Sequence, residues 1–253
     1  MQTIDRSHLV LIPSYNPGSK IILTVTEARS AWNPVWVVVD GSTDGSLEIL
    51  EEMAEKDQGL KVIKLNHNQG KGAAVHEGIR LAHQSGYTHV LTMDSDGQHP
   101  SGSIGAFMAL SKASPDSMIL GWPVFEADAP SLRVKGRQIS NWWANLETLW
   151  SGIGDSLFGF RVYPIDPLME ILNHQPFMRR FDFDPEAVVR LRWRGIRAIN
   201  ESAPVRYFTA QEGGVTHFKY GRDNLLLTFM HTRLFIEFIV RLPLLILRRW
   251  RES

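Results

Sequence analysis

The sequence predicts an α/β fold whose mostly parallel, twisted sheet is flanked by helices. Short apolar runs at residues 8–13, 35–40, 61–65, 89–94 and 118–122 alternate with segments whose apolar residues recur at helical spacing. Alternation of strands and helices is typical of parallel sheets, because each connection between parallel strands must cross back over the sheet. We therefore expect a layered α/β domain in the first half of the chain.

The composition is that of a folded protein with balanced charge. The chain has 253 residues and 43% of them are hydrophobic, which is enough for a full α/β core. Its 27 basic and 27 acidic residues cancel, so no overall field favours nucleic acid, and we expect none as a partner. Cysteine is absent, which excludes disulfides and thiol catalysis and fits a reducing compartment. The first residues lack the features of a signal peptide, so we expect a cytoplasmic location.

Polar, turn-forming clusters follow four of the predicted strands. They lie at residues 13–16, 40–44, 66–72 and 94–97. The carboxyl ends of parallel strands meet at one edge of a sheet, and ligands of open α/β folds bind at that edge. We expect these four clusters to form one site.

The cluster at residues 94–100 has the pattern of a metal site. The carboxylates of Asp94 and Asp96 can turn toward one hard cation if the chain leaves extended geometry there, as Gly97 encourages. Gln98 can add a carbonyl oxygen. Such a site suits Mg²⁺ or Mn²⁺ bridging a diphosphate. The alternative is a solvated turn, because Asp, Ser and Gly are common turn residues.

Four motifs stand in order within about the first hundred residues: VLIPSYN at 10–16, VVVDGSTDGS at 37–46, NQGKGAA at 68–74 and DSDGQHP at 94–100. In this order they resemble the dolichol-phosphate-mannose-synthase-like branch of the family 2 glycosyltransferases. The resemblance implies a GT-A fold, a nucleotide-sugar donor carrying UDP or GDP, a divalent cation, and attack at the anomeric carbon with inversion.

The motifs also suggest roles for single residues. Asp40 ends a predicted buried strand and can accept a hydrogen bond from the N–H of a uracil or guanine base. Its alternative role is to cap the next helix, for which Asp44 is better placed. Gly70 and Gly72 let the backbone approach phosphate, with Lys71 as a nearby charge. The expected substrate-binding residues of this half are Pro13, Tyr15, Asn16, Asp40, Asn68, Gly70, Lys71, Gly72, Asp94 and Ser95.

Three carboxylates precede a predicted helix in the second half of the chain: Asp182, Asp184 and Glu186. The helix dipole also favours acidic residues in a first turn, so a structural role is the alternative for each. Asp184 matches the family's base position most closely and joins Asp94 and Asp96 in the expected catalytic set. A hydroxyl acceptor would give its proton to Asp184, whereas an ionised phosphate would only be oriented by it.

Two further segments are expected to meet the substrates. Residues 158–161 resemble the family's acceptor-side strand, and Arg161 could hold an anionic headgroup. The Gly-rich, charged segment 213–223 could close over the diphosphate, although a surface connection is the alternative. The side chains that would then reach the diphosphate are His217, Lys219 and Arg222.

The C-terminal segment, residues 225–247, is apolar but carries several charges and Pro243, which makes it a poor transmembrane helix. We expect an amphipathic helix in the plane of an anionic membrane, peripheral on its inner face. Packing against the domain, or pairing with a second copy, is the alternative. The residues expected among the headgroups are Arg241, Arg248, Arg249, Trp250 and Arg251, and a second apolar contact could come from Trp142, Trp143 and Trp150.

These expectations combine into one organisation and one activity. Residues 1–221 form the GT-A glycosyltransferase domain, with a nucleotide-sugar half at 1–122 and an acceptor half at 123–221, and residues 222–253 form the membrane-associating helix. The expected activity is inverting transfer to a lipid-linked acceptor, such as a polyprenyl phosphate or a glycolipid hydroxyl. The alternative is a catalytically silent, nucleotide-sugar-binding or scaffolding member of the family. A nucleotidyltransferase fits these motifs less well.

Overall fold

The computed structural model describes residues 4–125, 131–205 and 218–252. In chain order its elements are β1 (His8–Ser14), α1 (Lys20–Ala31), β2 (Val35–Asp40), α2 (Ser46–Lys56), β3 (Leu60–Leu65), α3 (Lys71–Gln84), β4 (His89–Thr92), the 3₁₀ turn η1 (Ser101–Ser103), α4 (Ile104–Ala113), β5 (Ser117–Phe125), α5 (Ser131–Glu147), β6 (Arg161–Pro164), α6 (Ile165–His174), α7 (Phe183–Trp193), β7 (Arg197–Val205) and α8 (Tyr220–Glu252).

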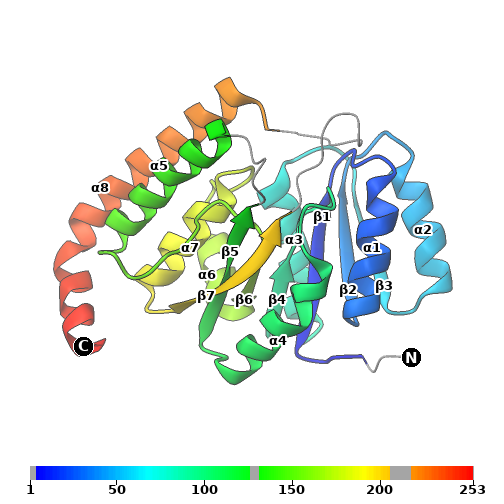
Figure 1. Cartoon of the computed structure of the whole chain (residues 1–253), viewed down its shortest axis with the longest axis horizontal. Helices are drawn as coiled ribbons and strands as arrows, with labels where there is room; N and C mark the ends of the chain where they lie inside the picture. Colours follow the sequence, from blue (N-terminus) through cyan, green and yellow to red (C-terminus); the bar gives the residue numbers. More distant parts are fainter. Residues whose placement is uncertain (1–3, 126–130, 206–217, 253) are drawn as a thin grey trace.

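The strands form one seven-stranded sheet in the order β3-β2-β1-β4-β6-β5-β7. All of the pairings are parallel except those of β6, which runs antiparallel to both β4 and β5. The prediction of a mostly parallel sheet covered by helices is confirmed (Figure 1). The five predicted apolar runs coincide with β1 to β5.

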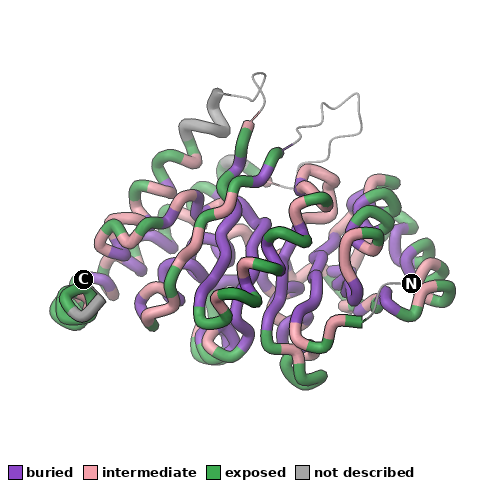
Figure 2. The backbone as a smooth tube through the Cα atoms, turned by 60° about the horizontal axis from the view of Figure 1, so that its bottom comes forward, coloured by how far each residue is buried: buried purple, intermediate pink, exposed green. Residues whose placement is uncertain are grey.

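Each apolar strand contributes side chains to two separate cores. Along β1, Leu9 and Leu11 pack on one face with α3, α6 and α7, while Val10 and Ile12 pack on the other with α1, α2 and α4. Successive side chains of a strand point to opposite faces, so a strand covered on both sides must be apolar throughout. This explains the continuous apolar runs of β1, β2 and β4, which are buried throughout, and Figure 2 shows the buried middle of the sheet.

A third layer, made of α5 and α8, covers α7 on its outer side (Figure 1). The long helix α8 is built into the domain, because Met230, Leu234 and Phe238 are buried in the same core as α7. Pro243 lies inside this helix. No helix among the described residues combines the length and apolar character needed to cross a membrane.

Charged side chains of α8 point inward and pair with α7. The carboxylate of Glu186 is fully buried and lies 2.6 Å from the guanidinium groups of both Arg190 and Arg233. Arg190 also contacts Glu237 at 2.7 Å. A buried carboxylate is stable only when it is paired and hydrogen-bonded, so this chain of charges fixes the rotation of α8 about its axis.

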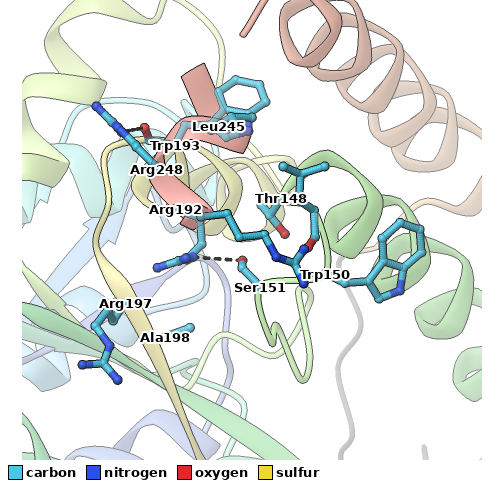
Figure 3. Close-up of a pocket in the computed structure, with 11 residues that line it drawn as sticks. Thr148, Trp150, Ser151, Arg192, Trp193, Arg197, Ala198, Leu245 and Arg248 are labelled. Carbon is cyan, nitrogen blue, oxygen red and sulfur yellow. Dashed lines mark hydrogen bonds between the residues drawn. The ribbon is translucent and has the colours of Figure 1, made fainter. Parts of the chain in front are cut away.

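Because the charges face inward, apolar side chains of α8 face outward. The side chains of Ile236, Val240 and Leu244 are 61%, 77% and 63% exposed. Near the end of α8, Arg248 donates to the carbonyl of Trp193 (Figure 3) and Arg249 to that of Leu149, while both residues stay exposed.

Arg241 likewise lies over the ring of Trp193. Trp250 is exposed, and the side chain of Arg251 lies outside the described part of the structure.

Substituting Arg233→Ala should test the buried charges. It leaves Arg190 as the remaining partner of Glu186, and we expect the free energy of unfolding to fall by roughly 2–3 kcal/mol, measured by urea denaturation. The matched control is Arg80→Ala, which removes a more exposed ion pair with Glu77 and should change stability far less. Equal losses in the two variants would contradict a structural role for the Glu186 pairing.

Candidate active site

A cavity of about 800 Å³ opens at the carboxyl ends of β1, β2 and β4. Four carboxylates and five cationic side chains are among the described residues that line it. The predicted site residues that line it are Pro13, Tyr15, Asp40, Asn68, Gly70, Lys71, Asp94, Ser95, Asp96, Gln98, Asp184, Lys219 and Arg222. The strand-end clusters therefore form one site, as the parallel sheet requires.

The turn after β4 carries the first two carboxylates. Asp96 accepts a hydrogen bond from the backbone N–H of Gln98 at 3.0 Å, which closes the turn at Gly97. The buried ring of His99 accepts the backbone N–H of Asp94 at 2.8 Å through Nδ1, so its Nε2, 3.4 Å from the Asp94 carboxylate, carries the proton. His99 thereby fixes both the backbone and the side chain of Asp94.

The ammonium of Lys71 joins this turn to α7. Its Nζ lies 2.7 Å from Asp94 and 2.7 Å from Asp184, and only 13% of the side chain is exposed. Asp184 is buried in the first turn of α7, and its second oxygen, Oδ1, has no hydrogen-bond partner among the described residues. A buried carboxylate oxygen without a donor beside a cavity is a ready acceptor for a substrate proton.

Charge coupling sets the protonation of this cluster. Burial opposes ionisation of Asp94, but the charge and hydrogen bond of Lys71 help to outweigh it, and the pKa of Asp94 is lowered to about 2. Burial, followed by the charge of Asp94, raises the pKa of Asp96 to about 6. Burial lowers the pKa of His99 to about 4, so this ring is neutral at pH 7. Two neighbouring carboxylates that do not readily carry a negative charge at the same time are typical of a cation-binding site, because a bound cation would stabilise both charges.

Asp40 organises the loop before α3. Its carboxylate accepts the backbone N–H groups of Gln69 and Gly70 at 2.8 and 2.7 Å and the side-chain amide of Asn68 at 3.1 Å. Burial outweighs these hydrogen bonds, and the pKa of Asp40 is raised. Asp44, in contrast, accepts the N–H of Ser46 at the start of α2, as predicted for a cap.

Comparison with known proteins identifies the family. Residues 9–172 match the family described as Glycosyl transferase family 2. The chain belongs to this family. It is a glycosyltransferase, as the resemblance of its four motifs predicted.

Two curated relatives illustrate the similarity of this chain to known glycosyltransferases. The chain is 27% identical over 177 residues to an undecaprenyl-phosphate mannosyltransferase of Micrococcus luteus, covering 64% of this chain and 68% of that protein. It is 29% identical over 203 residues to a polyprenol monophosphomannose synthase of Mycolicibacterium smegmatis, covering 74% of this chain and 71% of that one.

Two solved structures share the fold. One is glucosyl-3-phosphoglycerate synthase of Mycobacterium tuberculosis in complex with Mn²⁺, UDP-glucose and phosphoglyceric acid, with TM-score 0.56, 17% identity, and coverage of 83% of this chain and 75% of that one. The other is residues 1–349 of S. aureus TarS with UDP-GlcNAc, with TM-score 0.55, 18% identity, and coverage of 83% and 62%. A longer TarS chain is spanned over only 37% of its length.

One predicted contact of this glycosyltransferase is corrected by the structure. Arg161 is fully buried and donates hydrogen bonds to the hydroxyl of Tyr163 and to the backbone carbonyl of Asp184. It therefore supports the first turn of α7 from within the core and is not among the residues that line the cavity. Asn16 accepts the N–H of Thr43 and joins two loops.

A β-carbon added at Gly72 would point into the protein. A β-carbon there would lie 2.0 Å from the carbonyl oxygen of Met178, so glycine is required for the backbone before α7 to approach α3.

The three candidate bases occupy different surroundings. Asp182 accepts the backbone N–H groups of Met178 and Arg180, and Glu186 is held by the buried charges facing α8. Among the three, only Asp184 lines the cavity.

The predicted closing segment is described only in part. His217 lies outside the described residues. Lys219 and Arg222 line the cavity at the start of α8, where Asp223 accepts hydrogen bonds from the backbone N–H of Lys219 and the Nε of Arg222.

Sequence reasoning assigned no role to His99, Arg180 or Gly159. His99 belongs to the motif at 94–100, and its position directly after the carboxylates was the available signal. Arg180 lines the cavity next to Gly70. A β-carbon on Gly159 would lie 2.6 Å from Lys71 Nζ, which no local pattern could reveal.

Substituting Gly159→Ala should displace the Lys71 ammonium. The neighbouring atom is the end of a flexible side chain, so we expect the thermal unfolding midpoint to change little while transfer slows about 10- to 100-fold. Gly105→Ala is the matched control, because a β-carbon there meets no atom within 4 Å. Full activity of Gly159→Ala would show that the position of Lys71 does not matter.

Proposed function

We propose that this glycosyltransferase moves a sugar from UDP or GDP to a lipid-linked acceptor with inversion, at an anionic membrane surface facing the cytoplasm. The observation that carries the proposal is the convergence of Asp94, Asp96 and Asp184 on one cavity, where Lys71 links two of them. Metal-assisted sugar transfer to a hydroxyl needs carboxylates that bind the cation and a further carboxylate that accepts the proton of the acceptor.

The nucleotide end of the donor is assigned to the loops after β1 and β2. Asp40 lies at the cavity wall together with Tyr15, and its buried carboxylate is suited to accept an N–H of the base. Its bonds to the backbone of Gln69 and Gly70 hold the neighbouring loop in place around the donor. The UDP-sugar complexes of the two solved structures support a donor of this class.

A divalent cation, Mg²⁺ or Mn²⁺, fits the donor set at the turn after β4. Asp94, Asp96 and Gln98 supply hard oxygen ligands on one side of the cavity, and they are the residues that would hold it. Among the described residues no group of three or more acidic, cysteine or histidine side chains could by itself hold a metal ion. When bound, the cation would supply positive charge to the departing diphosphate.

The chain's own groups handle the acceptor. A hydroxyl acceptor would place its proton on the unpartnered Oδ1 of Asp184 while its oxygen forms the bond to the anomeric carbon and the bond to the diphosphate oxygen breaks. An acceptor phosphate arrives ionised and needs no base. Lys71 would then help to offset the charge between that phosphate and Asp184.

The acceptor is assigned to a lipid because apolar side chains form part of the cavity lining: Leu157, Phe181, Leu227 and the exposed Ile139. Ile139 and Leu227 come from α5 and α8, which also bring Arg137 and Arg222 to the cavity. The outward face of α8 is apolar as well, with Ile236, Val240 and Leu244 exposed, and neighbouring exposed apolar side chains are typical of a binding face. The polyprenyl-phosphate mannose transferases among the relatives support this class of acceptor.

The tryptophans of α5 and the following turn extend that face. Trp142 and Trp150 are 51% and 55% exposed and meet edge to face, whereas Trp143 packs against His231 and Phe235. Partly exposed tryptophans are typical of the interface between lipid and water. We therefore assign this side of the molecule to the membrane.

Substituting Asp96→Ala should lower turnover at least about 100-fold and remove the metal dependence of nucleotide binding, because the leaving group loses its charge stabilisation. Both can be measured with a panel of UDP- and GDP-sugars, with Mn²⁺ or with chelator. Asp116→Ala, an exposed carboxylate away from the cavity, is the control. Normal activity of Asp96→Ala in chelator would contradict the metal assignment.

The same panel separates an enzyme from a silent binder. An enzyme hydrolyses or transfers from at least one nucleotide-sugar. A silent member would be stabilised thermally by nucleotide and turn over none of them.

Substituting Leu244→Glu should weaken binding to lipid vesicles at least about tenfold, because it places a charge on the apolar face of α8. Donor hydrolysis should be unchanged, since Leu244 does not line the catalytic cavity. Leu23→Glu, at a similarly exposed leucine of α1, is the matched control in a vesicle sedimentation assay. If both variants bind alike while Leu244→Glu alone changes the oligomeric state, this face pairs two copies instead.

A further inference from the structure

The carboxylate of Asp40, at the end of β2, holds the loop before α3 and also lines the catalytic cavity. Asp40 is only 2% exposed, so any group that meets it there is withdrawn from water. UDP and GDP differ in their base, and a cavity of about 800 Å³ has room for either uracil or guanine. Hydrogen bonding at Asp40 is therefore the feature that can tell the two bases apart.

Hydrogen bonds from the protein occupy most of the acceptor capacity of this carboxylate. An ionised carboxylate has about four acceptor positions, shared equally between its oxygens. The backbone N–H of Gln69 takes a position on Oδ1 at 2.8 Å. The backbone N–H of Gly70 and the side-chain amide of Asn68 both bind Oδ2, at 2.7 and 3.1 Å. Oδ2 is therefore filled, and the remaining acceptor position is on Oδ1.

Uracil and guanine present different groups to such an acceptor. Uracil has a single ring N–H, at N3, which lies between two carbonyl oxygens. Guanine has two adjacent donors, the N–H at N1 and the amino group at N2, and together they match the two oxygens of a carboxylate. With Oδ2 filled, Asp40 can accept the N–H of uracil, whereas it can accept one of the two guanine donors and leaves the other without a partner. A buried donor without an acceptor is costly, because it has lost its hydrogen bonds to water.

The side chains next to Asp40 add donors to the cavity lining. The amino group of Asn68 points to Asp40 and has a second N–H that can be donated to an oxygen of the base. Arg180 also lines the cavity. Burial raises the pKa of Asp40, and the charge of Arg180 is among the influences that oppose this rise, so the guanidinium is close to the carboxylate. Donors beside one free acceptor position match a base edge on which carbonyl oxygens flank one N–H.

We propose that this site selects uracil over guanine, so that the donor is a UDP-sugar, and that Asn68 sets the selection by occupying Oδ2 of Asp40. The inference rests on the proposed function, because it takes the nucleotide of the donor to lie against Asp40. Asn68 is thereby a specificity-determining residue for the base and acts through Asp40. It takes no part in the transfer of the sugar.

The first test measures the affinity of the unmodified protein for UDP and for GDP by titration calorimetry with Mn²⁺ present. UDP should bind at least about tenfold more tightly, because the guanine amino group would give up its hydrogen bonds to water without replacement. UDP that is methylated at N3 has no ring N–H to donate, and it should lose affinity by a similar factor. Equal or tighter binding of GDP, or undiminished binding of the methylated UDP, would overturn the proposal.

Asn68→Ala tests the residue that sets the selection. The variant opens a position on Oδ2, so that Asp40 can accept both guanine donors, and the ratio of the two affinities should shift toward GDP at least about fivefold. Asn66→Ala is the matched control, because Asn66 is an exposed amide of the same loop and does not line the cavity. Its ratio should equal that of the unmodified protein. If Asn68→Ala weakens both nucleotides alike and leaves the ratio unchanged, Asn68 serves the loop alone and the proposal is wrong.

The proposed transfer reaction fails by a different result. A protein that binds UDP but turns over no nucleotide-sugar would refute the transfer, while the ratio of the two affinities would still decide the base. A protein that transfers sugar from a GDP-linked donor in preference to a UDP-linked one would support the transfer and refute the selection of uracil.

Discussion

The ammonium of Lys71, held between the carboxylates of Asp94 and Asp184, is the contact on which the arrangement of the site depends. These two carboxylates come from the end of β4 and the start of α7; Asp184 is buried and Asp94 is partly exposed in the cavity. Without a cation between them they would repel each other or take up protons. Lys71, at the first position of α3, therefore joins three elements that the chain supplies far apart in sequence.

Glycines make this contact possible. Gly159 leaves the space that the end of Lys71 occupies, and Gly72 lets the segment before α7 reach the first turn of α3. Arg161 supports the same place from within the core, because its guanidinium donates to the backbone carbonyl of Asp184. The position of Asp184 is thus set by packing on one side and by charge on the other.

Helix α7 also connects the catalytic cavity with the outer layer. It carries Asp184 at its start and presents Glu186 and Arg190 to α8, where Arg233 and Glu237 pair with them. Burying these charges between two helices leaves the opposite side of α8 to apolar residues. The same pairing that stabilises α8 therefore leaves its outer face apolar.

Local sequence was sufficient for β1 to β5 and for the polar loops at their carboxyl ends that line the cavity, whereas it did not predict β7. An apolar run such as Val35–Asp40 can be recognised in the sequence because a strand covered on both faces has no polar side. The polar clusters that follow the strands come together because the carboxyl ends of parallel strands lie at one edge of the sheet. Other features depended on contacts between distant segments: the burial of Arg161, the choice of Asp184 over Asp182 and Glu186, and the antiparallel direction of β6. The rotation of α8 about its axis also depended on such contacts. A helix that carries both charged and apolar residues can turn either set toward the domain, and the buried Glu186 is the partner that turns Arg233 of α8 inward.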